Sequence, residues 1–142
     1  MTARQIEIIK QSWQSAQHLD PVLIGDFFYS KLFLEYPEVQ PLFKISRVEQ
    51  ANKLISTLAL VVAKLETLGE LSNAIKQMAI RHVNYGVKAE HYQLVGECLL
   101  WTLQTILKDK WNKELEEAWA TCYGTLAQTM IDAAYVPAEQ AA

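Results

Sequence analysis

Apolar residues recur at every third or fourth position along most of the chain, which is the period of an α-helix with one buried face. Thr2 and Gln5 form a capping box, and the apolar positions after them predict a first helix of about four turns. Asp20 and Pro21 supply the cap and the first-turn proline of a second helix, which Pro37 ends. No stretch alternates between apolar and polar residues as a strand bounded by hairpin turns would. The pattern therefore predicts an all-α chain.

The rest of the chain predicts further helices with the same period. Ser46 and Glu49 form a second capping box at the start of a long helix. Ser72 is suited to cap the next helix, and Gly86 is suited to end it. A strongly apolar helix then begins at Glu90, and one more follows it. The residues expected on the inward faces of the long helices are Ala51, Leu54, Leu58, Val61, Leu65, Tyr92, Val95, Leu99, Leu103, Ile106, Leu115, Ala118, Cys122, Leu126 and Met130.

Two local features concern helix packing. Gly25 lies in the middle of the second helix, where glycine costs about 1 kcal/mol relative to alanine. We expect close approach by a crossing helix to compensate for that cost. Pro37 and Pro41 confine the next segment to short turns, which carry Phe43 into a corner between longer elements.

The chain is predicted to form a single domain. No period of 20 to 50 residues repeats and no linker divides the sequence. We place the domain at residues 1–136 and expect a short flexible tail at residues 137–142. The helices, about seven in number, differ in length and in their connections, which favours an irregular helical sandwich over an up-and-down bundle.

Composition narrows the class of protein. The chain has 142 residues, of which 51% are hydrophobic and 20% charged, as in a globular domain with a sizeable core. The net charge of −3 without a basic cluster argues against nucleic acid or an anionic membrane surface as a partner. The longest uncharged apolar run, residues 54–63, is too short to span a bilayer, and the N-terminus lacks a basic segment followed by an apolar one. We expect a soluble, cytoplasmic protein.

Motif searches exclude several kinds of chemistry. Cys98 and Cys122 lie in apolar helical patterns and are expected to be reduced, packed thiols. The glycine spacing excludes dinucleotide and phosphate-binding loops, and the HExxH and GxSxG motifs are absent. With three histidines in the chain, an all-protein metal cage or a Ser/His/Asp site is poorly supported.

One residue departs from the pattern in the segment 71–87. An inward stripe of this helix is predicted to carry Leu71, Ile75, Met78, His82 and Tyr85. His82 therefore lies where an aliphatic side chain is expected. Taken alone, such a histidine is more often a hydrogen-bonded core residue than a ligand.

The order of features along the chain resembles the globin family. Tyr29 follows Phe28 on one helix, Phe43 lies in the proline-bounded corner, and Gln50 lies one turn before Leu54 on the next long helix. The segments that carry the resemblance are GDFFYSKLFLEYPEVQPLF, QANKLISTLALVV, RHVNYGVKAEHYQLVGECLLWTL and WATCYGTLAQTMI. They cover nearly the whole chain and are most similar to single-domain globins of the flavohaemoglobin lineage.

The resemblance implies a globin fold around haem b. His82 would be the proximal iron ligand, and Phe43 would stack at the haem edge. Tyr29, Gln50 and Leu54 would lie on the distal side. Further haem contacts are expected from Phe28, Val87, Tyr92, Val95 and Tyr123.

Tyr29 and Gln50 are expected to donate hydrogen bonds to a bound gas. Oxygen on ferrous haem carries partial negative charge, so a donor in a dry pocket contributes on the order of 1.5 to 3 kcal/mol. Neither side chain is as good an iron ligand as histidine, so the gas-free iron should be five-coordinate or water-bound. The alternatives are that Tyr29 covers a helix crossing beside Gly25 and that Gln50 is a solvated first-turn residue.

The proximal side departs from the flavohaemoglobin pattern. Tyr92 lies ten residues after His82, as in that family, but the glutamate that would complete the hydrogen-bonded set is replaced by Ala134. Asp132 is expected on a different face of the helix. This loss weakens electron push toward O–O cleavage, so peroxidase chemistry is not expected. Lys53 and Arg81 are candidates for the haem propionates, with solvated surface charge as the equal alternative.

The sequence thus predicts a haem protein that binds oxygen tightly, and also nitric oxide and carbon monoxide. Nitric oxide dioxygenation is an extension implied by the family. Because flavohaemoglobins carry fused reductase domains, turnover here is expected to require a separate reductase. Two alternatives are a haem-based gas or redox sensor or interaction domain, and a globin-like helical module without haem.

Overall fold

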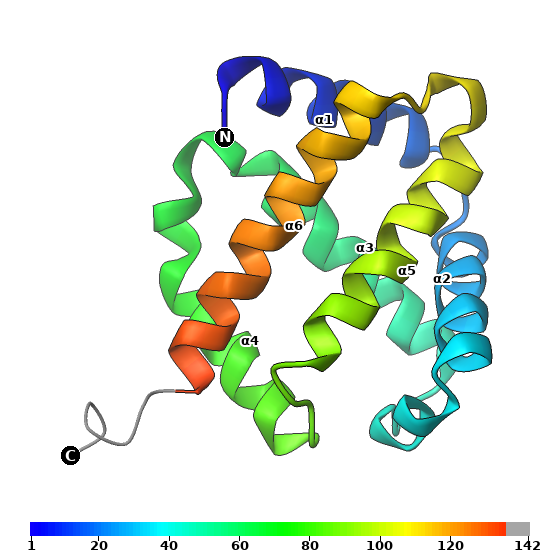
Figure 1. The fold of residues 1–142 in the computed structure, drawn as a ribbon, viewed down its shortest axis with the longest axis vertical. Helices are drawn as coiled ribbons and strands as arrows, with labels where there is room; N and C mark the ends of the chain where they lie inside the picture. Colours follow the sequence, from blue (N-terminus) through cyan, green and yellow to red (C-terminus); the bar gives the residue numbers. More distant parts are fainter. Residues whose placement is uncertain (136–142) are drawn as a thin grey trace.

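A computed structural model describes residues 1–135, in which the chain forms six α-helices and three 3₁₀ helices (Figure 1). The α-helices are α1 (Ala3–Ala16), α2 (Pro21–Glu35), α3 (Arg47–Ala63), α4 (Ser72–Asn84), α5 (His91–Leu107) and α6 (Lys113–Ala134). The 3₁₀ helices are η1 (Pro37–Leu42), η2 (Leu65–Leu71) and η3 (Lys108–Lys110). The all-α prediction is confirmed. The predicted tail, residues 137–142, and residue 136 lie outside the described residues.

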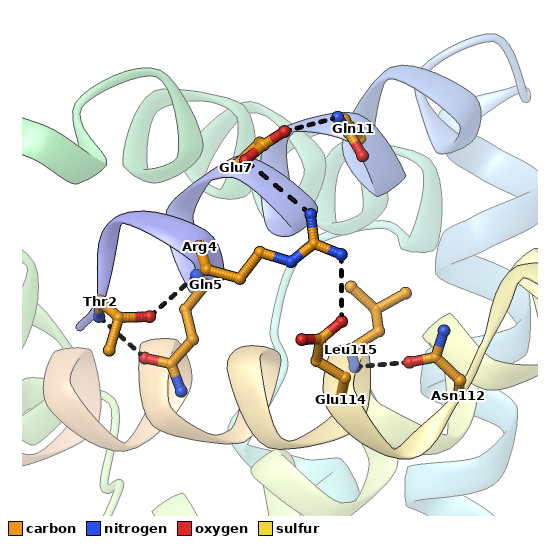
Figure 2. A network of polar contacts seen from close by, with 8 residues as sticks. All are labelled: Thr2, Arg4, Gln5, Glu7, Gln11, Asn112, Glu114 and Leu115. Carbon is orange, nitrogen blue, oxygen red and sulfur yellow. Dashed lines mark hydrogen bonds and ion pairs between the residues drawn. The ribbon is translucent and has the colours of Figure 1, made fainter.

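Side-chain caps fix where the helices begin. The Thr2 hydroxyl accepts from the Gln5 amide at 3.0 Å, and the Gln5 side chain accepts from the Thr2 amide at 3.0 Å, so the predicted capping box is confirmed (Figure 2). Asn112 caps α6, and Arg4 reaches Glu114 at 3.2 Å, which joins the first turns of α1 and α6 (Figure 2). The predicted caps Asp20 and Ser46 also accept from backbone amides. At Ser46 the bond from the Glu49 amide forms at 3.2 Å, but within residues 1–135 the reciprocal bond that would complete the predicted capping box does not.

The start of α4 differs from the prediction. Ser72 is already helical, with φ −55° and ψ −41°, and the preceding Leu71 takes the N-cap position without a side-chain bond. The reason is that η2 runs directly into α4, so the chain does not pass through the extended conformation that a serine cap requires. Gly86 does end the helix, as predicted, with φ +95°.

The backbones of α2 and α3 approach each other closely where the two helices cross. A Cβ atom on Gly25 of α2 would lie 2.3 Å from the Cβ atom of Ala51 on α3, which confirms the predicted close approach. The largest fully buried side chains are Trp119, Ile9, Leu32, Leu103, Thr102 and Cys98. Trp119 donates its indole N–H to Ser12 at 3.0 Å, so α6 and α1 share a satisfied polar contact in the core.

Buried residues fall into two apolar clusters. The larger cluster contains Tyr29, Phe28 and side chains from α1, α2, α3, α5 and α6. The smaller one is built by Ile75, Ala79, Tyr92, Ala127 and Met130, and it joins α4 to α6. In Figure 1, α4 lies beside the end of α6, whereas α2 lies on the far side of α5. The helix that carries His82 is therefore held by a different set of contacts from the helix that carries Tyr29.

The two cysteines and the hydrophobicity of the helices bear on the earlier predictions. Cys98 and Cys122 are buried, unbridged thiols, as predicted, and burial raises the pKa of each to about 11. Within residues 1–135, no helix has the length and apolar character needed to cross a membrane.

Candidate functional site

An aromatic cluster surrounds Tyr29 on α2. The Tyr29 ring is 3% exposed, and its centroid lies 4.8 Å from that of Phe28, 5.9 Å from that of Phe33 and 5.5 Å from that of Phe43. The Phe33 and Phe43 centroids are 5.3 Å apart in an edge-on arrangement. Phe43 follows η1 and enters this cluster from the proline-bounded corner, as the sequence predicts. Aromatic packing alone is therefore enough to fix the position of the Tyr29 ring.

The Tyr29 hydroxyl has a weak internal partner. It donates to the backbone carbonyl oxygen of Gln50 on α3 at 3.3 Å, which is long for an O–H donor. Burial raises the pKa of Tyr29 to about 12, against the opposing effects of Gln50 and the Arg47 charge. The phenol is therefore a neutral donor at physiological pH, and little free energy is lost if it turns to a better acceptor.

Tyr29 is one of the residues that line a cavity of about 170 Å³. Its lining residues are Tyr29, Phe33, Gln40, Phe43, Ile45, Arg47 and Gln50. Gln50 thus lies next to Tyr29, as predicted, and Leu54 is half-buried against the larger cluster one turn later. Arg47 was not anticipated. It donates to Ser30 at 3.1 Å and holds its guanidinium 5.8 Å from the Phe33 ring centroid, at the cavity wall.

His82 occupies the last turn of α4 and is half-buried. Its Nδ1 atom lies 2.7 Å from the carbonyl oxygen of Met78. Because a carbonyl oxygen only accepts, Nδ1 carries the proton and Nε2 keeps its lone pair. Burial lowers the pKa of His82, in the same direction as the Arg81 charge and against the bond to Met78. At neutral pH the side chain therefore presents an unprotonated Nε2.

Tyr92 of α5 lies beside His82. The two ring centroids are 6.5 Å apart, and the ring planes are inclined by 23°. The Tyr92 hydroxyl is buried and has no hydrogen-bond partner within residues 1–135, and burial raises its pKa to about 12. Tyr123 donates to the Tyr92 carbonyl at 2.6 Å, and Gly96 makes room for the Tyr123 ring, because a Cβ atom there would lie 2.7 Å from it.

One more residue lies on the His82 side of the molecule and was not predicted from the sequence. Tyr135, directly after α6, donates its hydroxyl to the carbonyl oxygen of Val87 and packs against the smaller cluster. Ala134 is half-buried, while Asp132 is exposed and bonds Gln128 at 2.8 Å, so Asp132 lies on a different face, as expected. Tyr135 directly follows Ala134, so a tyrosine at the end of α6 was visible in the sequence. It was missed because the predicted inward residues of α6 end before this position.

One stripe prediction was wrong. Ile75 is buried and Met78 is half-buried with His82, but Tyr85 is 47% exposed. The α-helix ends at Asn84, so Tyr85 belongs to the turn and not to the inward face.

The other predicted site residues vary in burial. Val95 and Val87 are half-buried, the first against the larger cluster and the second against the smaller one. Lys53 and Arg81 are exposed, and neither forms an ion pair with any residue in 1–135. The assignment of Lys53 or Arg81 to haem propionates stays a prediction.

The donor set fits the haem that the resemblance implies. The imidazole of His82 has a free Nε2 that would hold an iron atom, and Tyr29 offers a neutral O–H packed against aromatic rings. The hydroxyl of Tyr92 beside His82 is buried and has no hydrogen-bond partner within residues 1–135. Because buried polar groups are normally hydrogen-bonded, this one leaves room for a partner from a bound group.

Comparison with known proteins gives a family match over most of the chain. The family model described as Globin matches residues 26–130. The chain is 31% identical to the flavohemoprotein of Vibrio cholerae over 99% of this chain and 37% of that protein. It therefore spans little more than a third of that relative's length.

Two solved structures are similar over most of both chains. A globin from Campylobacter jejuni is 32% identical, with a TM-score of 0.81, and the match covers 93% of this chain and 95% of that one. An engineered carbene transferase form of a putative nitric oxide dioxygenase from Rhodothermus marinus is 29% identical, with a TM-score of 0.80 and coverage of 90% and 89%.

Proposed function

The chain belongs to the globin family, and on that premise we propose that it holds haem b between His82 on one side and Tyr29 with Gln50 on the other. In this role it binds oxygen reversibly, and also nitric oxide and carbon monoxide. When bound, haem would supply an iron atom that His82 would hold and at which a diatomic gas could bind.

The observation that carries the proposal is the tautomer of His82. The Met78 carbonyl holds the Nδ1 proton at 2.7 Å, so the ring orientation and the free Nε2 are set before any cofactor arrives. Burial lowers the pKa of His82, which keeps Nε2 unprotonated at neutral pH. The residue is prepared to ligate a metal without first losing a proton.

The distal residues supply hydrogen-bond donors beside aromatic side chains. Tyr29 keeps its proton because burial raises its pKa to about 12, and it is free to exchange its 3.3 Å bond to Gln50 for a bond to a gas. The side-chain amide of Gln50 is a second donor that lines the same cavity. Phe33 and Phe43 pack around Tyr29, so the hydroxyl acts in a low-dielectric surrounding.

We extend the proposal to nitric oxide dioxygenation. The support is the similarity to a flavohemoprotein and to a putative nitric oxide dioxygenase. In this reaction nitric oxide, oxygen and one electron give nitrate, so repeated turnover requires a reductase as partner. We propose that the protein acts in the cytoplasm, where the free thiols of Cys98 and Cys122 persist.

An absorption spectrum after haem reconstitution tests the cofactor. We expect a Soret band that shifts when carbon monoxide is added to the reduced protein. A protein with no Soret band would refute the proposed function. For the extension, nitrate is measured during continuous reduction in the presence of oxygen and nitric oxide. Sustained nitrate formation supports dioxygenation, while a single turnover restricts the function to gas binding.

A further inference from the structure

The cavity beside Tyr29 is lined by hydrogen-bond donors and by one positive charge. Its polar lining residues are Tyr29, Gln40, Arg47 and Gln50. The guanidinium of Arg47 carries only donors, and the phenol and the two amides can each offer a donor as well. Within residues 1–135, no aspartate or glutamate lines this cavity. The lining therefore favours an anion over a cation or an apolar molecule.

The guanidinium of Arg47 is held in place without being neutralised. Its Nη2 atom donates to the Ser30 hydroxyl at 3.1 Å, and its Cζ atom lies 5.8 Å from the centre of the Phe33 ring. Ser30 does not line the cavity, so this bond restrains the side chain while its other N–H groups stay available. In the part of the chain that the structure describes, Arg47 forms no ion pair. Its charge is therefore available to a ligand.

The cavity extends from the surface to a buried hydroxyl. Gln40 and Arg47 are exposed, whereas Tyr29 is buried. Burial raises the pKa of Tyr29 to about 12, and the Arg47 charge opposes that rise, so the guanidinium acts on the inner wall of the cavity. An ion at Arg47 can enter from solvent and keep part of its hydration, which lowers the cost of binding it.

The size of the cavity and the shape of the guanidinium limit the class of anion. The volume of about 170 Å³ is below the roughly 300 Å³ at which pockets for drug-sized ligands begin. It has room for a few water molecules or for an ion of similar size. A guanidinium donates two parallel N–H bonds in one plane, which match two oxygens of a planar oxyanion better than a spherical halide.

We propose that this cavity binds a small planar oxyanion of the nitrate and nitrite class through Arg47, with the side-chain amides of Gln40 and Gln50 as further donors. The site is formed by protein side chains alone and therefore goes beyond the proposed binding of haem and gas. Its location beside a bound gas rests on the proposed function. Under that function, nitrate formed by dioxygenation would be held next to the place where it arises.

A nuclear magnetic resonance titration of the purified full chain with sodium nitrate tests the site. The side-chain amide signals of Gln40 and Gln50 should shift and saturate, and sodium chloride at the same ionic strength should not reproduce these shifts. Arg47→Gln should weaken nitrate binding about tenfold, because a hydrogen bond to a charged group is lost. Lys44→Gln is the matched control, since it removes the same charge from an exposed residue outside the cavity lining.

Equal shifts with chloride would overturn recognition of an oxyanion, and unchanged nitrate affinity in Arg47→Gln would overturn the role of Arg47. A second readout is the infrared carbon–oxygen stretch of carbon monoxide bound to the haem-loaded protein. Nitrate should raise this frequency in the wild type and in Lys44→Gln, because an anion offsets the positive charge near the gas, and should leave Arg47→Gln unchanged.

The two readouts separate the anion site from the proposed function. A carbon–oxygen stretch that nitrate does not move in the wild type would overturn the location beside the gas. Failure of the wild-type chain to take up haem would overturn the proposed function, while the nitrate titration of the same chain still decides whether the anion site exists.

Discussion

Tyr29 and His82 are held in place by different physical means. Tyr29 is 3% exposed and is enclosed by three phenylalanine rings within the larger apolar cluster. His82 is half-buried on a helix that packs mainly on α6, and its position depends on hydrogen bonds to Met78 and at the Val87 turn. The surroundings of Tyr29 should therefore respond to changes in side-chain volume, while those of His82 should respond to changes in backbone geometry.

The largest expected effect is the loss of the proximal ligand. His82→Ala should abolish stable haem retention, measured as transfer of haem to apomyoglobin, and added imidazole should restore it by occupying the vacated position. His18→Ala, at an exposed histidine after α1, is the control. Wild-type haem retention in His82→Ala would show that the iron is held elsewhere.

A second substitution probes the packing of the distal side. Gly25→Ala should lower the free energy of unfolding by about 2 kcal/mol, because its Cβ atom would lie 2.3 Å from that of Ala51. Gly124→Ala, where no atom lies within 4 Å of the new Cβ, should instead stabilise α6 by about 0.5 to 1 kcal/mol. Urea denaturation measures both. Equal effects would mean that the α2–α3 crossing can relax and that packing does not fix Tyr29.

A smaller effect is expected from the distal donor. Tyr29→Phe should speed oxygen dissociation about tenfold, equivalent to 1.4 kcal/mol, because the hydroxyl is lost while the aromatic packing stays. Tyr36→Phe removes a hydroxyl that bonds Glu97 at 2.9 Å on the surface, and it should leave the rate unchanged. Stopped-flow measurement of the oxygen dissociation rate in the two variants tests this prediction. An unchanged rate in Tyr29→Phe would remove this residue from the distal role.

The smallest expected effect is a pH dependence that stays flat. Burial raises the pKa of Tyr29 to about 12, so the phenol keeps its proton, and its capacity to donate, throughout the alkaline range up to that value. Oxygen dissociation from the wild-type protein should not change between about pH 7 and pH 10, where an unperturbed tyrosine would begin to ionise. A rate that rises across this interval would mean that the hydroxyl is more exposed than its packing indicates.

Helix ends could be predicted from the sequence where they depend on residues that are adjacent in the chain. The caps at Thr2, Asp20 and Ser46 and the stop at Gly86 are local signals, and the structure confirms them. Ser72 misled because a 3₁₀ helix precedes α4, and helical periodicity does not detect a change of helix type.

Residues that depend on distant contacts were harder to predict. Tyr29, Phe43 and His82 were predicted through the order of motifs along the chain, and their roles toward haem stay a prediction. Arg47 and Tyr135 were missed because their contacts are made with other elements, at positions that no periodic pattern marks. The exposure of Tyr85 was missed because the stripe was extended one residue beyond the end of the helix.

The Tyr29 hydroxyl donates to the main-chain carbonyl oxygen of Gln50. Every residue type at position 50 supplies that carbonyl, so substitution there can alter the second donor without depriving Tyr29 of its resting partner. Under the proposed function, residue 50 could therefore be changed to adjust gas selectivity while Tyr29 keeps its main-chain acceptor.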